Sequence, residues 1–215
     1  MNNKSADVEI RPAREDELPA AIELLAYTFA QDRAVRSIMA HTGGQHNNVD
    51  FARAIYEIQV YGHYFPKGEV DLAIDGGEIV GVGLWARPNK QMSTPKFMAL
   101  LPKYINLFRR AVPFVARREA RTANAHPGFA HWYLFAIAVS SRVQGKGIGS
   151  TMLKHGLRRA GDAPVYLEGL HAEVRGSVPL AGLRGARPDR GRRRQAGRPA
   201  GGRHVAAYPA RRGLA

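Results

Sequence analysis

The sequence predicts one α/β (α+β) domain, and three features carry this prediction. Residues 69–74 alternate polar and apolar side chains, an Asp-Gly-Gly turn follows, and residues 78–85 are again rich in branched side chains, which is typical of a β-hairpin. Residues 131–139 are apolar almost throughout, as in a strand that is covered on both faces. A glycine-rich loop then leads into a segment with helical apolar spacing, so strands and helices alternate along the chain.

The N-terminal third is expected to form one short strand and two helices. Residues 8–12 alternate and then stop at a proline, which predicts a short strand. Residues 15–29 carry three acids and then apolar residues at three- and four-residue intervals, the pattern of an amphipathic helix. Apolar spacing predicts a second helix over residues 51–61, and the polar residues 41–50 before it are interpreted as a loop.

The segment between the hairpin and the long apolar strand is less regular. Residues 90–121 mix apolar and basic side chains around Pro102 and Pro113, which we interpret as an irregular helical insertion broken at the prolines. After the long strand, the glycine loop opens a further helix, and residues 163–168 supply one more strand.

The net charge of +14 is concentrated at one end of the chain. Residues 169–215 hold eleven arginines, no lysine and two acids, so this segment carries +9 and residues 1–168 carry +5. The segment is rich in Arg, Gly, Ala and Pro and has no hydrophobic period. The sequence therefore predicts a folded domain at residues 1–168 and a separate tail at residues 169–215.

Composition excludes several classes of protein. No stretch approaches the roughly 20 apolar residues that span a bilayer, so we expect no membrane segment. Residues 1–7 lack the apolar core of a signal peptide. The absence of cysteine excludes disulfides, thiolate zinc sites and a cysteine nucleophile, and it fits a reducing compartment, so we expect a cytoplasmic protein. The histidines show no metal-ligand spacing, and no metal is expected.

Three glycines, Gly145, Gly147 and Gly149, lie between the long strand and the following helix. This arrangement leaves backbone amides at a helix N-terminus with no side chains in the way, and such amides bind phosphate oxygens. A Walker loop needs Gly-Lys-Ser/Thr, but Lys146 is followed by Gly147. A Rossmann loop needs glycine at the third position after Gly147, which is Ser150. The loop therefore belongs to neither class.

The loop matches the pattern Gln/Arg-x-x-Gly-x-Gly/Ala as Gln144-Gly145-Lys146-Gly147-Ile148-Gly149. Together with the order of strands and helices over roughly residues 8–168, it resembles the GNAT family of N-acetyltransferases. The resemblance implies a GNAT-like mixed, mostly antiparallel sheet with acetyl-CoA in the cleft between the fourth and fifth strands. It also implies transfer of the acetyl group from acetyl-CoA to a primary amine of a small molecule or peptide, by direct attack in a ternary complex.

The same resemblance implies a set of cofactor contacts. Backbone amides of the loop hold the pyrophosphate, a serine hydroxyl adds a contact, and the end of the long strand faces the pantetheine arm. The implied cofactor-binding residues are Ile137, Ala138, Val139, Gln144, Gly145, Lys146, Gly147, Ile148, Gly149 and Ser150.

Two residues are candidates for the catalytic proton transfer. Glu168 ends the strand expected beside the cofactor strand, where a carboxylate can accept the proton of an amine directly or through water. The alternative is a strand-end charge that meets solvent or an arginine. Tyr133 either points toward the cleft or packs in the core, as aromatic residues in apolar strands commonly do.

The C-terminal segment departs from the family pattern. Family members continue after the fifth strand with a helix that carries a tyrosine, often the catalytic acid, and then with Gly-Phe and two closing strands, none of which is found here. Read one nucleotide later, the codons of residues 182–185 can encode Gly-Phe-Glu-Val, and those of residues 169–175 and 200–206 can encode strand-like continuations. We hypothesise that the chain is frameshifted after about residue 168 and that the tail is disordered, which the nucleotide sequence of codons 160–215 tests.

Two other functions stay open. An Arg-rich tail is compatible with a nucleic-acid-binding protein, but arginine without interleaved aromatics is poor support for specific recognition, and we do not expect a nucleic-acid partner. The second alternative is a relative that binds acetyl-CoA without catalysis. Homodimers are common in the family and are compatible with this sequence, which does not identify the acceptor amine.

Overall fold

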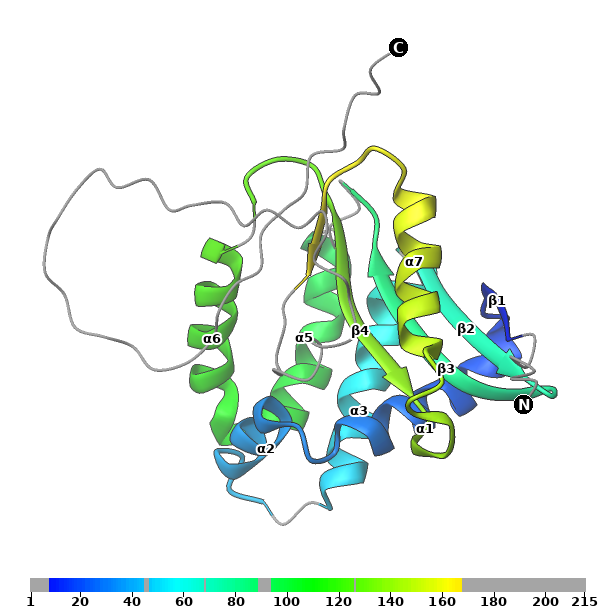
Figure 1. Cartoon of the computed structure of the whole chain (residues 1–215). Coiled ribbons are helices and arrows are strands. Elements are labelled where there is room, and N and C mark those ends of the chain that lie inside the picture. Colours follow the sequence, from blue (N-terminus) through cyan, green and yellow to red (C-terminus); the bar gives the residue numbers. More distant parts are fainter. Residues whose placement is uncertain (1–7, 45–46, 68, 89–93, 126, 168–215) are drawn as a thin grey trace, which may run out of the picture.

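The computed structural model describes residues 8–44, 47–67, 69–88, 94–125 and 127–167. Over these residues, five strands form one sheet in the order β1-β2-β3-β4-β5 (Figure 1). The strands are β1 (Glu9–Pro12), β2 (Glu69–Asp75), β3 (Glu78–Ala86), β4 (Trp132–Val139) and β5 (Val165–Leu167). The first three pairings are antiparallel and the β4–β5 pairing is parallel, which confirms the predicted mixed, mostly antiparallel sheet. The predictions for Glu168 and for the tail lie outside the described residues.

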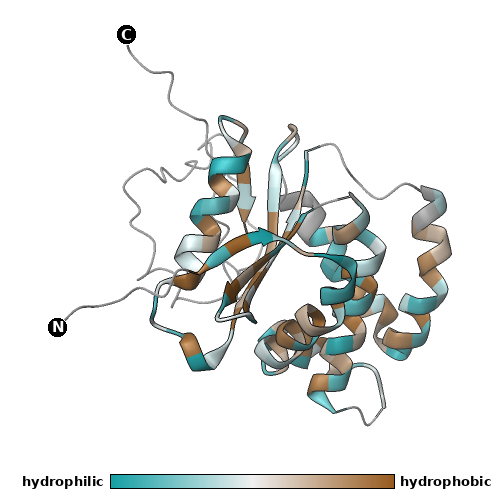
Figure 2. Cartoon of the chain, turned by 90° about the vertical axis from the view of Figure 1, so that its right-hand side faces the viewer, coloured by the Kyte–Doolittle hydropathy of each residue, from teal (hydrophilic) through white to brown (hydrophobic). Residues whose placement is uncertain are grey.

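Helices cover both faces of the sheet. The longer helices are α1 (Leu18–Phe29), α2 (Arg33–Ala40), α3 (Asn48–Gln59), α5 (Thr94–Phe108), α6 (Val112–Ala125) and α7 (Ile148–Ala160). The short helical segments are η1 (Glu15–Glu17), the π-helix η2 (Val60–Tyr64), α4 (Phe65–Lys67), η3 (Arg109–Ala111) and η4 (Ser141–Val143). Figure 2 shows the sheet close to edge-on, with α7 on one side and the other long helices on the opposite side.

The largest apolar core lies between α1 and the sheet. Leu18, Ile22 and Leu25, whose spacing predicted the helix, are buried against Leu72 of β2 and Leu84 of β3. Apolar residues at three- and four-residue intervals lie on one face of a helix, which explains why this segment packs with a single face inward. The first predicted helix is thus confirmed.

The segment before the second predicted helix contains a helix that the sequence analysis missed. The helix α2 has eight residues, and its two buried residues, Val35 and Ile38, are too few to form a clear period. Its N-cap is Asp32, whose carboxylate accepts from the N–H of Ala34 at 2.7 Å. The helix α3 begins at residue 48 because Asn47 caps it, so the predicted loop at 41–50 is shorter than expected.

The insertion is two helices, and its break differs from the predicted one. Pro102 lies inside α5 without ending it, which corrects the expectation that this proline breaks the helix. Pro113 lies in the first turn of α6, where the missing N–H costs no intrahelical hydrogen bond. The chain breaks instead at Arg109, which has a positive φ of 46°.

The N-terminal strand is tied to α1 by a bidentate ion pair. Arg11 of β1 donates from Nη1 to Oε2 of Glu17 at 2.8 Å, and the Arg14 N–H donates to the same carboxylate at 2.9 Å. These hydrogen bonds, led by the one from Arg11, lower the pKa of Glu17 from 4.5 to about 2. The carboxylate therefore stays ionised down to a lower pH in the folded chain than in the unfolded chain.

Because its pKa is lower in the folded chain, Glu17 should contribute stability that is present above about pH 4.5 and lost as the pH falls toward about 2. Glu17→Gln does not titrate at this position. Its free energy of unfolding, measured by urea denaturation, should therefore fall less than that of the wild type across this window. Parallel pH profiles for the two proteins would contradict this assignment.

The helix α7 approaches the sheet closely because glycines stand in the contact. A Cβ atom at Gly156 would lie 2.0 Å from a ring carbon of Trp85, and one at Gly81 would lie 2.7 Å from the Met152 sulfur. Trp85 is 1% exposed, so its ring has no free space into which to move. Glycine is therefore required at position 156 by packing.

We expect Gly156→Ala to destabilise the protein, although alanine favours a helix over glycine by about 1 kcal/mol. Overpacking of a buried contact costs roughly 1–3 kcal/mol, and a 2.0 Å approach is at the severe end of such contacts. Urea denaturation should show a net loss of stability. Gly128→Ala is the control, because a Cβ there meets nothing within 4 Å. Equal stability of Gly156→Ala and wild type would mean that α7 lies farther from β3.

Candidate functional site

The strand β4 carries a β-bulge in its middle. Leu84 of β3 is the register partner of Ala136, and the next residue of β3, Trp85, is the partner of Leu134. Phe135 is therefore an extra residue in β4, and the ladder is interrupted at this point. Bulges bend a strand and re-aim its backbone groups, and they are common beside active sites.

The other edge of β4 is paired over only part of its length. The strand β5 pairs with β4 in parallel at Trp132, Tyr133 and Leu134, and the last pair joins Leu134 to Leu167. Residues 135–139 have no strand partner on this edge among the described residues. Their backbone N–H and C=O groups can therefore bond to an extended ligand that lies along β4.

The predicted pantetheine contacts, Ile137, Ala138 and Val139, lie in this part of β4. Ala138 is fully buried in the core on the α1 side, while Ile137 and Val139 are half-buried against the cluster that includes Met152 of α7. The side chains of all three are occupied in packing. Only their backbone groups remain for a ligand.

The glycine loop turns the chain from β4 into α7 through two residues with positive φ. Gly145 has φ 81° and Gly147 has φ 79°, a region that other residues adopt at a cost of roughly 1–2 kcal/mol. A Cβ atom at either position would meet nothing within 4 Å. Backbone conformation requires these glycines, and the space beside them is open.

The N-terminus of α7 faces this open space. Gly147 is the N-cap and has no side chain, and the first intrahelical bond runs from the Thr151 N–H to the Gly147 carbonyl at 3.0 Å. The amides of Ile148 and Gly149 precede that bond. Such amides and the positive end of the helix dipole attract anions, and a phosphate is the common ligand of this geometry.

The first turn of α7 is held directly against the end of β4. A Cβ atom at Gly149 would lie 3.5 Å from Cγ2 of Val139, and the Ser140 N–H donates to the Val80 carbonyl at 2.9 Å. Val143 and Ile148, on either side of the glycines, are buried in the same apolar cluster. The strand edge and the helix N-terminus therefore meet at one place.

The polar side chains of the loop lie on its outside. Gln144 donates from Nε2 to the Val139 carbonyl at 3.4 Å, Lys146 is exposed, and Ser150 is half-buried in the first turn of α7. Arg142 forms an exposed ion pair with Glu78 of β3 at 3.0 Å. All the cofactor-binding residues predicted from the sequence thus lie together at the junction of β4 and α7.

Tyr133 lies at the opposite end of β4, where β5 is paired. Its ring stacks on that of Tyr166 at 5.8 Å and meets the edge of Phe135 at 6.2 Å. Phe135 in turn stacks on the buried Tyr64 of η2 at 5.0 Å. Burial raises the pKa of Tyr64 well above its ordinary value, so its hydroxyl stays protonated. The other catalytic candidate, Glu168, directly follows the partner of Leu134 and lies outside the described residues.

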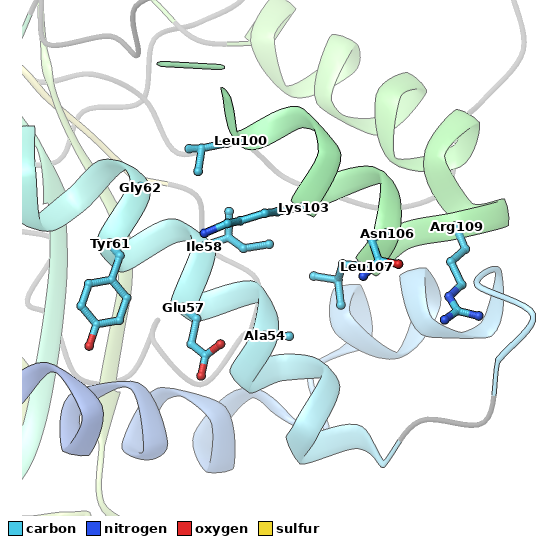
Figure 3. A pocket seen from close by; sticks show the side chains of 10 residues that line it. All are labelled: Ala54, Glu57, Ile58, Tyr61, Gly62, Leu100, Lys103, Asn106, Leu107 and Arg109. Carbon is cyan, nitrogen blue, oxygen red and sulfur yellow. The ribbon is translucent and has the colours of Figure 1, made fainter. Parts of the chain in front are cut away.

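A groove between α3 and α5 was not foreseen from the sequence. It has a volume of about 560 Å³, and Figure 3 shows the side chains that line it. Its floor and rim are formed by Ala54, Glu57, Ile58, Tyr61, Gly62, Leu100, Lys103, Asn106, Leu107 and Arg109. The residues come from α3 and α5 and from the segments η2 and η3 that follow them, and no local pattern encodes the contact between these parts of the chain.

The described part of the chain contains no group of three His, Asp or Glu side chains that could hold a metal ion. None of its helices is both long and apolar enough to cross a bilayer.

The comparisons agree with this geometry. The family model described as "Acetyltransferase (GNAT) family" matches residues 45–180, well over half of the chain. A crystal structure from Corynebacterium glutamicum, described as histone acetyltransferase HPA2 and related acetyltransferase, is 29% identical with a TM-score of 0.66. The match covers 96% of this chain and 99% of that chain.

Two further matches have lower similarity. Arylalkylamine N-acetyltransferase 2 from Aedes aegypti is 15% identical, with 80% of each chain covered and a TM-score of 0.49. A GNAT family acetyltransferase from Brucella melitensis, in complex with acetyl-CoA, is 14% identical, with 80% of this chain and 81% of that chain covered and a TM-score of 0.42. On the strength of the family match, this chain belongs to the GNAT acetyltransferase family and is an acyltransferase.

Proposed function

We propose that this protein transfers the acetyl group of acetyl-CoA to a primary amine of a small molecule or peptide, by direct attack in a ternary complex. The observation that carries the proposal is the meeting of two backbone surfaces. The edge of β4 that has no strand partner beyond Leu134 among the described residues leads to the glycine loop and the N-terminus of α7. A ligand with an amide-containing arm and a pyrophosphate suits both surfaces at once.

The loop supplies the anion site of this proposal. The amides around residues 144–149 bind the pyrophosphate, and the Ser150 hydroxyl adds one contact. The backbone of residues 137–139 bonds to the amides of the pantetheine arm. This assignment is supported by the positive φ of Gly145 and Gly147, because a side chain at either position would project into the open space beside the loop.

The chemistry at the other end of the cleft requires a proton acceptor. A primary amine attacks the thioester carbon only as the neutral base, and the proton that it loses must be removed. Glu168 directly follows β5 in the chain and is proposed to accept this proton directly or through water. The Tyr133 hydroxyl is proposed to take part in the same proton transfer. Tyr133 lies near the start of β4, where Tyr166 of β5 is its register partner.

The domain that performs this reaction is proposed to span residues 1–168 and to act in the cytoplasm, a reducing compartment that a chain without disulfides fits. The family match continues to residue 180 and so includes the first residues of the Arg-rich tail.

Gly147→Leu is expected to lower the affinity for acetyl-CoA at least about tenfold, because its side chain occupies the phosphate position. Gly161→Leu is the matched control. Gly161 lies after the other end of α7, also has a positive φ, of 58°, and also has no atom within 4 Å of its Cβ position. Leucine is strained at both positions, and more so at Gly161 (φ 58°, ψ −125°) than at Gly147 (φ 79°, ψ 6°). A loss of affinity confined to Gly147→Leu in isothermal titration calorimetry therefore reports obstruction of the site rather than strain. Equal affinities for the two variants would contradict a phosphate site at the loop.

The reaction itself is tested with the full chain, acetyl-CoA and a panel of primary amines, following thiol release and the mass of the acetylated product. Initial velocities should give intersecting double-reciprocal lines, as a ternary complex requires, and parallel lines would indicate an acetyl-enzyme instead.

Tyr133→Phe and Glu168→Gln should each lower kcat by about 100-fold with acetyl-CoA affinity unchanged. Tyr27→Phe, at a tyrosine that is 66% exposed on α1, is the control. Binding without turnover across the panel would favour a relative that has lost catalysis.

A further inference from the structure

A buried ion pair joins α7 to the sheet. Arg159, in the last turn of α7, donates from Nη1 to Oδ1 of Asp71 at 2.6 Å and from Nη2 to Oδ2 at 2.9 Å. Asp71 lies in the middle of β2, and its side chain is 1% exposed. The bond is bidentate, so it fixes the direction of the guanidinium plane as well as its distance.

Two indole rings complete the environment of this guanidinium. The Cζ atom of Arg159 lies 5.8 Å from the ring centre of Trp85 and 5.4 Å from that of Trp132. Its Nε is buried and has no hydrogen-bond partner among the described residues. The part of the cation not bonded to Asp71 is therefore stabilised by the aromatic faces rather than by further acceptors.

This cluster lies where the two strands of the proposed cofactor cleft come together. Trp132 is the first residue of β4 and the register partner of Val165 in β5. Its backbone N–H donates to the Pro164 carbonyl at 2.8 Å. Arg159 precedes by a few residues the turn that leads into β5. The cluster thus holds the closed end of the cleft, opposite the end at which the glycine loop stands.

Glycine makes room for the cluster on the neighbouring strand. Gly83 of β3 is the register partner of Asp71. A Cβ atom at Gly83 would lie 3.4 Å from Nε1 of Trp85 and 3.8 Å from the Asp71 Cβ. The indole, the carboxylate and the guanidinium therefore occupy one compact site between α7 and the sheet.

We propose that Asp71, Arg159 and Trp132 form a positioning device for the cofactor cleft. The bidentate bond and the contact with Trp132 hold the end of α7, and with it the start of β5, at a set position beside β4. The angle between β4 and β5, and hence the width of the gap that receives the acyl-pantetheine arm, depends on this position. This inference rests on the proposed function, because it assumes that acetyl-CoA lies between these strands.

An ion pair suits this role better than it suits stabilisation. A buried pair contributes little net stability compared with apolar residues of the same volume, because both charges lose their hydration. The bidentate hydrogen bonds of the ion pair fix the relative orientation of the two side chains, which an apolar contact does not. Removal of the pair should therefore change the geometry of the cleft more than the energy of the fold.

The test uses conservative variants of the full chain. Arg159→Lys keeps the charge and loses the bidentate geometry, and Trp132→Phe keeps an aromatic ring with a weaker cation–π contact. Each should lower the affinity for coenzyme A and acetyl-CoA about three- to tenfold in isothermal titration calorimetry. Each should also speed hydrogen exchange at residues 132–134, where β4 and β5 pair.

Arg53→Lys is the matched control. Arg53 of α3 also forms a two-point ion pair, with Glu23 of α1, in which Nη2 lies 3.1 Å from Oε2. This pair joins two helices away from the cleft. The variant should leave both cofactor affinity and exchange at residues 132–134 unchanged, even if its melting temperature falls.

Tryptophan fluorescence provides an independent readout. The chain has two tryptophans, Trp85 and Trp132, and both lie in the cluster. Acetyl-CoA should change the emission of the wild type, since it lies along the strand that Trp132 begins. The change should be smaller in Arg159→Lys at saturating ligand, because the guanidinium no longer holds the indoles in one arrangement.

The outcomes separate the two proposals. If the folded wild type binds neither coenzyme A nor acetyl-CoA, the proposed function is wrong and this inference falls with it. If the wild type binds and both variants bind equally well with unchanged exchange at residues 132–134, the cluster is structural only, and the proposed function stands. Weaker binding and faster exchange in Arg159→Lys and Trp132→Phe, with no effect of Arg53→Lys, support the positioning role.

Discussion

The close contact between α7 and the sheet is the constraint on which the rest of this structure depends. Glycines at positions 81 and 156 remove two side chains from the contact, so the Met152 sulfur and the Trp85 ring fill the space that remains. The contact sets the height of α7 above the sheet. That height places the first turn of the helix against Val139 and leaves its amides beside the open edge of β4. A helix held farther away would separate the two surfaces.

The site is built mainly from backbone, and this explains the composition of β4. The strand is bonded to β3 along one edge, with a bulge at Phe135, and within the described part of the chain it is bonded to β5 along only the start of the other edge. The side chains of Ile137, Ala138 and Val139 serve the cores on the two faces of the sheet. A strand of this kind can support packing and ligand binding at once. Its side chains point out of the two faces of the sheet, whereas its backbone N–H and C=O groups lie in the plane of the sheet.

Few charged side chains are buried in the described part of this fold. Asp71 is the acidic side chain buried most deeply among the described residues, and its partner comes from the helix on the other side of the contact. Asp71 is shielded from water and the Arg159 side chain is only 22% exposed, so the interaction is stronger and more directional than a surface ion pair. By contrast, the exposed pair between Arg142 and Glu78 at the glycine loop is solvated and constrains the chain less.

The sequence by itself determined the elements whose pattern is local. Apolar spacing identified α1, alternation identified the β2–β3 hairpin, and the glycines identified the loop before α7. It missed α2, which has too few buried residues for a period, and it misjudged Pro102, because the contacts of α5 with α3 support the helix through the proline. Nothing local indicated that Asp71 and Arg159, which lie 88 residues apart, form a pair. Turns and periods depend on neighbours within a few residues, whereas the bulge in β4, the groove beside α3 and the buried ion pair exist only after distant segments pack, so only the tertiary structure decided them.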